Sequence, residues 1–173
     1  MPDLQREAGV ALGDTSAWPD AVRDGIASHH AADAAFHDLS VFRAQSLALT
    51  LALLDADVPR GAARGIGHAG WELLFDGALL DREGMVEAYL AAMSVDVSGF
   101  AAEWSHALRR RVERGAPRFY ADPVSVTELL WRVLGQRRLL AFDRGQCDAV
   151  ALCLREAQPA INACVDEVLA ALS

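Results

Sequence analysis

The sequence predicts an all-α protein, a single-domain helical bundle of about six to seven helices over residues 1–173. Alanine dominates a hydrophobic content of 53%, and alanine favours helix over strand. Runs of β-branched residues are absent and aromatic residues are sparse. A chain of this length can bury one sizeable core.

Helix-starting residues place the first two helices. Residues 1–18 are expected to be partly irregular. Pro19 stands where a helix can begin, because its missing N–H costs no hydrogen bond in the first turn, and that helix is expected to reach about Asp38. Asp38 or Ser40 can cap the next helix, which we expect to end near Asp57.

The third expected helix, residues 60–75, is rich in glycine. It carries Gly61, Gly65, Gly67 and Gly70. Each glycine costs a helix roughly 1 kcal/mol relative to alanine. The sequence therefore predicts that a neighbouring backbone comes close to this helix.

Four further helices complete the expected fold. They are a helix from Asp81, one from about Ser98 to Arg114, one from Pro123 to Arg138, and a long last helix from Gly145 to Leu172 that is kinked or split at Pro159.

The charge of the chain is acidic overall but unevenly spread. The formal net charge is −8, and every one of the 16 basic residues is arginine. An acidic chain argues against nucleic acid as a partner, and the lack of lysine excludes Schiff-base chemistry. Nine of the arginines fall in residues 109–144, which we call the arginine band. It suits a phosphate or an acidic partner, and it also suits pairing with the acidic remainder of the chain.

Apolar runs and cysteines bear on the compartment. The longest apolar run, Leu47–Leu54, is far too short to span a bilayer, and no secretion signal opens the sequence. Cys147, Cys153 and Cys164 lack CxxC spacing and are expected to be reduced thiols in a core. We therefore expect a cytoplasmic protein that does not enter a membrane.

Two helices carry histidine and carboxylate in rows. His29, Asp33 and His37 stand four residues apart, so they share one side of a helix. His30 can lean onto the same side. On the glycine-rich helix, His68 and Glu72 are also four apart, and Asp76 lies four beyond.

Two interpretations of this pattern stay open, and one of them is a divalent metal site. His29 with Asp33, and His68 with Glu72, can converge between facing helices. Nitrogen and oxygen ligands without thiolate suit Mn, Fe, Zn or Mg, and a bound ion would supply hydroxide near neutral pH. The same spacing also fits hydrogen-bonded polar groups in a core or on a solvated surface.

Taken in order, several of these residues resemble the acyl carrier protein phosphodiesterase family. Gly25-Ile26 with His29 and Asp33 is similar to that family's GI-x-x-H-x-x-x-D helix. His68 with Trp71 and Glu72, and Val133–Arg138 before a long helix, are also similar to the family. Met1–Leu4 resembles the tail of the family's early apolar segment, which ends in an aspartate, here Asp3. The sequence departs from the family at His37, where the family has an acidic residue, and at Leu73, where it has a histidine.

The resemblance implies an HD-domain-like fold and a Mn-dependent phosphodiesterase that removes the 4′-phosphopantetheine arm from a carrier protein. The partner would be an acidic carrier protein or a small phosphorylated ligand. The implied site has metal ligands His29, Asp33, His68, Glu72 and Asp3, catalytic Asp33 and Glu72, secondary candidates His30 and His37, and phosphate-binding Arg110, Arg137 and Arg138.

Two other functions stay open. One is a non-catalytic helical protein that binds a ligand or a partner. The other is an HD-type nucleotide phosphohydrolase centred on the dipeptide His37-Asp38.

Overall fold

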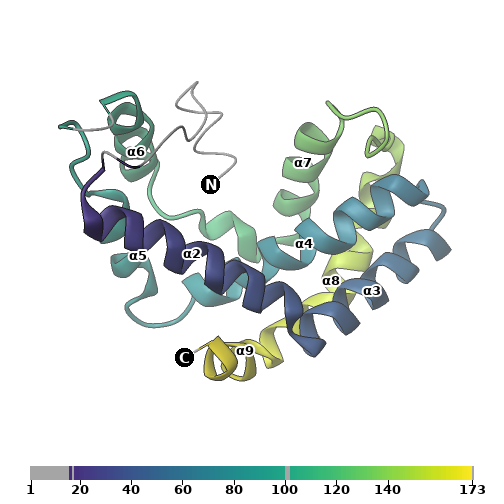
Figure 1. Cartoon of the computed structure of the whole chain (residues 1–173). Helices are drawn as coiled ribbons and strands as arrows, with labels where there is room; N and C mark the ends of the chain where they lie inside the picture. Colours follow the sequence, from purple (N-terminus) through teal and green to yellow (C-terminus); the bar gives the residue numbers. More distant parts are fainter. Residues whose placement is uncertain (1–15, 17, 100–101, 173) are drawn as a thin grey trace. The chain divides into compact units, whose positions relative to one another are not determined.

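The described part of the chain is helical, which confirms the all-α prediction (Figure 1). The computed structural model describes residues 16, 18–99 and 102–172, so the predicted ligand Asp3 lies outside the described residues. Those residues form eight α-helices, two 3-10 helices and no strand. In order they are α2 (Asp20–Asp38), α3 (Ser40–Asp55), α4 (Arg60–Leu80), α5 (Met85–Met93), α6 (Ala102–Arg114), η1 (Arg118–Ala121), α7 (Pro123–Leu134), η2 (Arg144–Gln146), α8 (Cys147–Ala163) and α9 (Val165–Leu172).

The chain forms two compact units. Unit 1 consists of Met1–Asp33 and Arg82–Pro117, as far as these residues are described, and contains most of α2 with α5 and α6. Unit 2 consists of Ala34–Asp81 and Arg118–Ser173, again within the described residues, and contains the last turn of α2 and all the other helices.

Helix α4 forms the centre of unit 2. It contacts α3, η1, α7, α8 and α9. Ile66, Trp71 and Leu74 of α4 are completely buried. The indole N–H of Trp71 donates a hydrogen bond of 3.0 Å to the side-chain oxygen of Gln45, so the one polar group of this buried side chain has a partner.

Close backbone approach to the glycines of α4 is confirmed. A Cβ atom on Gly61 would lie 1.8 Å from the carbonyl oxygen of Leu139, in the segment after α7. A Cβ on Gly67 would lie 2.0 Å from Oγ1 of Thr50 in α3. Gly65 differs, because its Cβ would meet nothing nearer than a leucine side chain at 3.5 Å.

Several boundary predictions are wrong. Helix α7 ends at Leu134 and not at Arg138, and α4 continues to Leu80, beyond the expected residue 75. Helix α3 has Leu39 as its N-cap residue, without a side-chain cap, whereas Asp38 forms an ion pair with Arg43 instead of capping. The last helical stretch is split, but not at Pro159: α8 continues through the proline and ends at Ala163, with Cys164 as its C-cap residue. A helix can pass a proline when it gives up one hydrogen bond, so the residue alone does not determine the break.

The start of α7 follows the sequence prediction. The Asp122 side chain accepts hydrogen bonds from the backbone N–H groups of Val124 and Ser125, and Pro123 occupies the first turn. The carboxylate also accepts a hydrogen bond of 2.6 Å from the Ser125 hydroxyl, and this bond, together with the backbone bond from Ser125, holds the pKa of Asp122 below its ordinary value.

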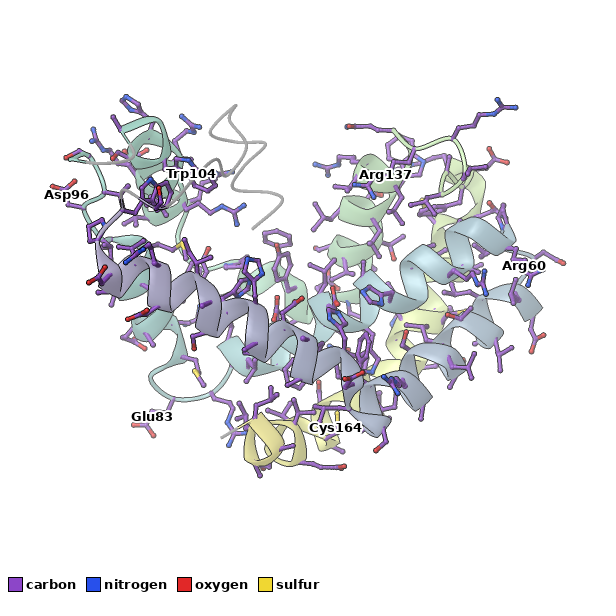
Figure 2. The ribbon with its side chains drawn as sticks, viewed as in Figure 1. Arg60, Glu83, Asp96, Trp104, Arg137 and Cys164 are labelled. Carbon is purple, nitrogen blue, oxygen red and sulfur yellow. The ribbon has the colours of Figure 1, made fainter. Side chains whose placement is uncertain are left out.

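The three thiols are free, as expected. Cys153 and Cys164 are buried and Cys147 is half-buried, and desolvation raises the pKa of each. Figure 2 shows Cys164 at the junction of α8 and α9. Among the described residues, none of the helices combines the length and the apolar character that crossing a bilayer requires.

The glycine contacts give the first testable prediction. Gly61→Ala should lower the free energy of unfolding by about 1–3 kcal/mol, because the added methyl group cannot fit against the Leu139 carbonyl. Gly65→Ala is the matched control on the same helix and should be neutral or stabilising by up to about 1 kcal/mol. Urea unfolding followed by circular dichroism measures both, and equal effects would contradict the packing described for α4.

Candidate metal centre

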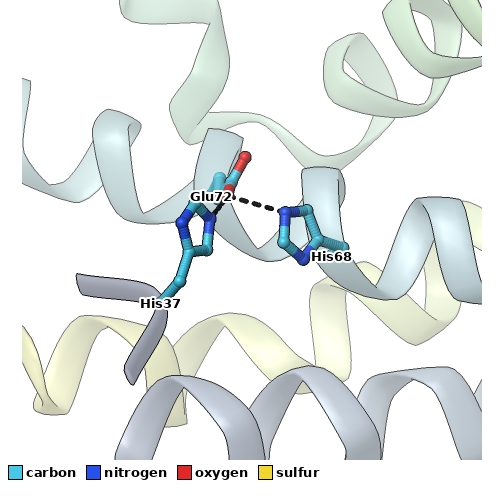
Figure 3. A group of neighbouring side chains, drawn as sticks. All are labelled: His37, His68 and Glu72. Atoms are coloured by element: carbon cyan, nitrogen blue, oxygen red, sulfur yellow. Dashed lines mark hydrogen bonds and ion pairs between the residues drawn. The ribbon is translucent and has the colours of Figure 1, made fainter. Parts of the chain in front are cut away.

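Three ligand-type side chains of unit 2 meet beside α4 (Figure 3). Nε2 of His37 lies 2.7 Å from Oε1 of Glu72, and Nε2 of His68 lies 3.1 Å from the same oxygen. One ligand atom from each residue falls within 4.8 Å of the others. We call His37, His68 and Glu72 the His-His-Glu group.

Local structure explains how each member is positioned. His68 and Glu72 stand four residues apart on α4, which places them on the same side of the helix one turn from each other. His37 comes from the last turn of α2. Phe36 and Phe42 lie on either side of it in the chain, and their rings lie 5.7 Å and 5.1 Å from the Trp71 ring. These aromatic contacts hold the end of α2 against α4.

The two imidazoles stack on each other. Their ring centroids are 4.9 Å apart and their planes differ by 11°. Phe42 presents its ring nearly perpendicular to both, at 5.2 Å from His37 and 5.3 Å from His68. The group thus has aromatic neighbours but stays open to solvent, with 31% of the His37 side chain, 34% of Glu72 and 52% of His68 exposed.

This donor set fits a divalent ion with free coordination positions. Two imidazole nitrogens and one carboxylate are the ligands of many catalytic zinc and non-haem iron sites, whereas closed structural sites use four protein ligands. Each imidazole must present an unprotonated nitrogen to a metal. Without a metal, Glu72 can accept a hydrogen bond from each ring instead, so protons and metal compete for the same atoms.

Asp76 adds a carboxyl group to the same row of α4. It lies one turn beyond Glu72. Desolvation by its surroundings, and then the negative charge of Glu72, raise the pKa of Asp76 from 3.8 to about 6, even though solvent reaches the side chain.

The structure distributes the sequence-predicted ligands over both units. His68 and Glu72 belong to the His-His-Glu group, together with His37, which was only a secondary candidate in the sequence prediction. His29, His30 and Asp33 are exposed residues of α2 in unit 1 and are not members of this group.

The arginine band is also divided. Arg110 lies on α6 in unit 1, whereas Arg137 and Arg138 are exposed residues of unit 2 in the segment that follows α7. Asp38, the second half of the His37-Asp38 dipeptide, pairs with Arg43 and is not in the His-His-Glu group.

One signal in the sequence could have given His37 more weight. The apolar residues around His29 are Ile26 and alanines, without a large aromatic side chain, whereas Phe36 and Phe42 flank His37. Large aromatic residues mark the part of a helix that packs on a core, so the end of α2 was the better place to expect a site.

Comparison of the chain with protein-family models, with curated proteins and with solved structures gave no match.

The raised pKa of Asp76 predicts a pH-dependent effect on stability. Between about pH 4 and pH 6 the unfolded chain releases this proton more readily than the folded protein, so ionisation of Asp76 lowers stability as the pH rises through that window. Asp76→Asn should therefore raise the melting temperature at pH 7, by a small amount because the side chain is exposed. At pH 4 the gain should vanish. A gain of equal size at pH 4 and pH 7 in differential scanning calorimetry would refute this assignment.

Proposed function

We propose that this protein is a metal-dependent, phosphodiesterase-like hydrolase whose metal is held by His37, His68 and Glu72. The single observation that carries the proposal is the meeting of two imidazoles and a carboxylate within 4.8 Å at a partly exposed position. A group of this composition binds an ion and still leaves room for water and substrate.

A metal ion held by His37, His68 and Glu72 would lower the pKa of a bound water and so supply hydroxide near neutral pH. Hydrolysis of a phosphodiester would add the water oxygen to phosphorus, break one ester P–O bond and release the alcohol with a proton. The resemblance to the acyl carrier protein phosphodiesterases favours Mn, two imidazoles also suit Fe or Zn, and Mg is the least suited.

The proposed substrate carries a phosphodiester, either on an acidic carrier protein or in a small phosphorylated ligand. Exposed arginines of unit 2, among them Arg137 and Arg138, support an anionic substrate. The three free thiols are in keeping with the cytoplasm as the proposed compartment.

Metal content tests the site. Wild-type protein purified without chelator and loaded with Mn should hold one ion per chain by elemental analysis. His37→Ala and Glu72→Gln should lose the ion, because each removes one of three ligands. His29→Ala and His106→Ala, which change exposed histidines of unit 1, should keep it. Loss on His29→Ala with retention on His37→Ala would move the site toward the start of α2, to His29 and Asp33.

Hydrolysis tests the reaction. Metal-loaded wild-type protein should cleave bis(4-nitrophenyl) phosphate or release the arm of a holo-carrier protein. Glu72→Gln should lower kcat/KM by more than about 100-fold through loss of the ion. A wild-type protein that keeps its metal but cleaves neither substrate would instead be a non-catalytic binding protein.

A further inference from the structure

A row of basic residues leads along α4 to the His-His-Glu group. Arg60, Arg64, His68 and Glu72 follow one another at intervals of four residues. Side chains at this spacing are neighbours on a helix, with Cβ atoms about 5–6 Å apart. The contact of 3.1 Å between His68 and Glu72 shows that neighbours in this row touch. Arg64 thus stands one turn before His68 on α4, and its side chain is longer than that of His68.

The charges of these two arginines are not neutralised within the described part of the chain. Arg60 and Arg64 are exposed and form no ion pair with a described residue. Elsewhere in the protein, Arg43 and Arg144 pair with Asp38 and Glu128. The row therefore presents positive charge that no ion pair with a described residue neutralises.

The segment after α7 brings further positive charge to the first turns of α4. The Leu139 carbonyl lies against Gly61, and the Leu140 side chain would touch a Cβ on Gly65 at 3.6 Å. Arg137 and Arg138 precede these leucines and are exposed, and they too have no ion pair among the described residues. Figure 2 labels Arg60 at the start of α4 and Arg137 just after α7.

We propose that Arg64, with Arg60 behind it, is an oxyanion-binding subsite that adjoins the metal centre and holds a phosphate group of the ligand. This inference rests on the proposed metal centre, because Arg64 can bind a phosphate of the substrate only if the reaction takes place at the neighbouring His-His-Glu group. A guanidinium group donates several N–H bonds in one plane and binds two oxygens of a phosphate at once. A phosphate can therefore place one oxygen on the ion and present others to Arg64.

Titration calorimetry of Mn-loaded protein tests the subsite, with methyl phosphate and acetate as probes. Arg64→Gln should weaken methyl phosphate binding by about tenfold or more, because a charge-assisted hydrogen bond is lost. Arg64→Lys should recover part of the affinity. Arg155→Gln, which changes an exposed arginine of α8, should leave it unchanged. Methyl phosphate should bind more tightly than acetate, which carries less charge and fewer oxygens.

The outcomes separate the subsite from the metal centre. Unchanged methyl phosphate affinity in Arg64→Gln, at equal metal content, overturns the subsite and leaves the metal centre standing. Equal affinity for acetate and methyl phosphate overturns the phosphate assignment. If wild-type protein holds no metal, the metal centre fails and the same titration of metal-free protein decides the subsite. A tenfold loss in Arg64→Gln then supports it, and absence of binding to wild type overturns it.

Discussion

The close approach of neighbouring backbone to the glycines of α4 is the constraint on which unit 2 depends. At Gly61 and Gly67 a methyl group would overlap the segment after α7 and helix α3, and at Gly77 it would overlap η1. Alanine is the better helix former, so these positions give up helix stability for contact. Because α4 also carries His68 and Glu72, the same contacts fix the position of two members of the His-His-Glu group.

The third member of the group, His37, is placed by tertiary packing. His37 lies at the end of α2, where Phe36 and Phe42 meet Trp71 on α4. The aromatic cluster orients the imidazole and leaves Glu72 between two rings. The same three groups are the ligands of the proposed metal ion.

The features of this structure that depend on local spacing could be predicted from the sequence. The helical class, the glycine contacts and the pairing of His68 with Glu72 all follow from rules that act within one helix. Features that depend on contacts between segments could not be predicted in this way. The choice of His37 over His29, the break at Cys164 and the division into two units are set by which surfaces meet, and a spacing of four residues carries no information on that.

The position of a bound ion tests the central claim most directly. Crystals grown with Mn²⁺ and measured near the Mn absorption edge would locate the ion by its anomalous scattering. We expect one peak within bonding distance, about 2.0–2.3 Å, of Nε2 of His37, Nε2 of His68 and a carboxylate oxygen of Glu72. A fully occupied peak bound by other residues, or no peak at this group at saturating Mn²⁺, would contradict the account.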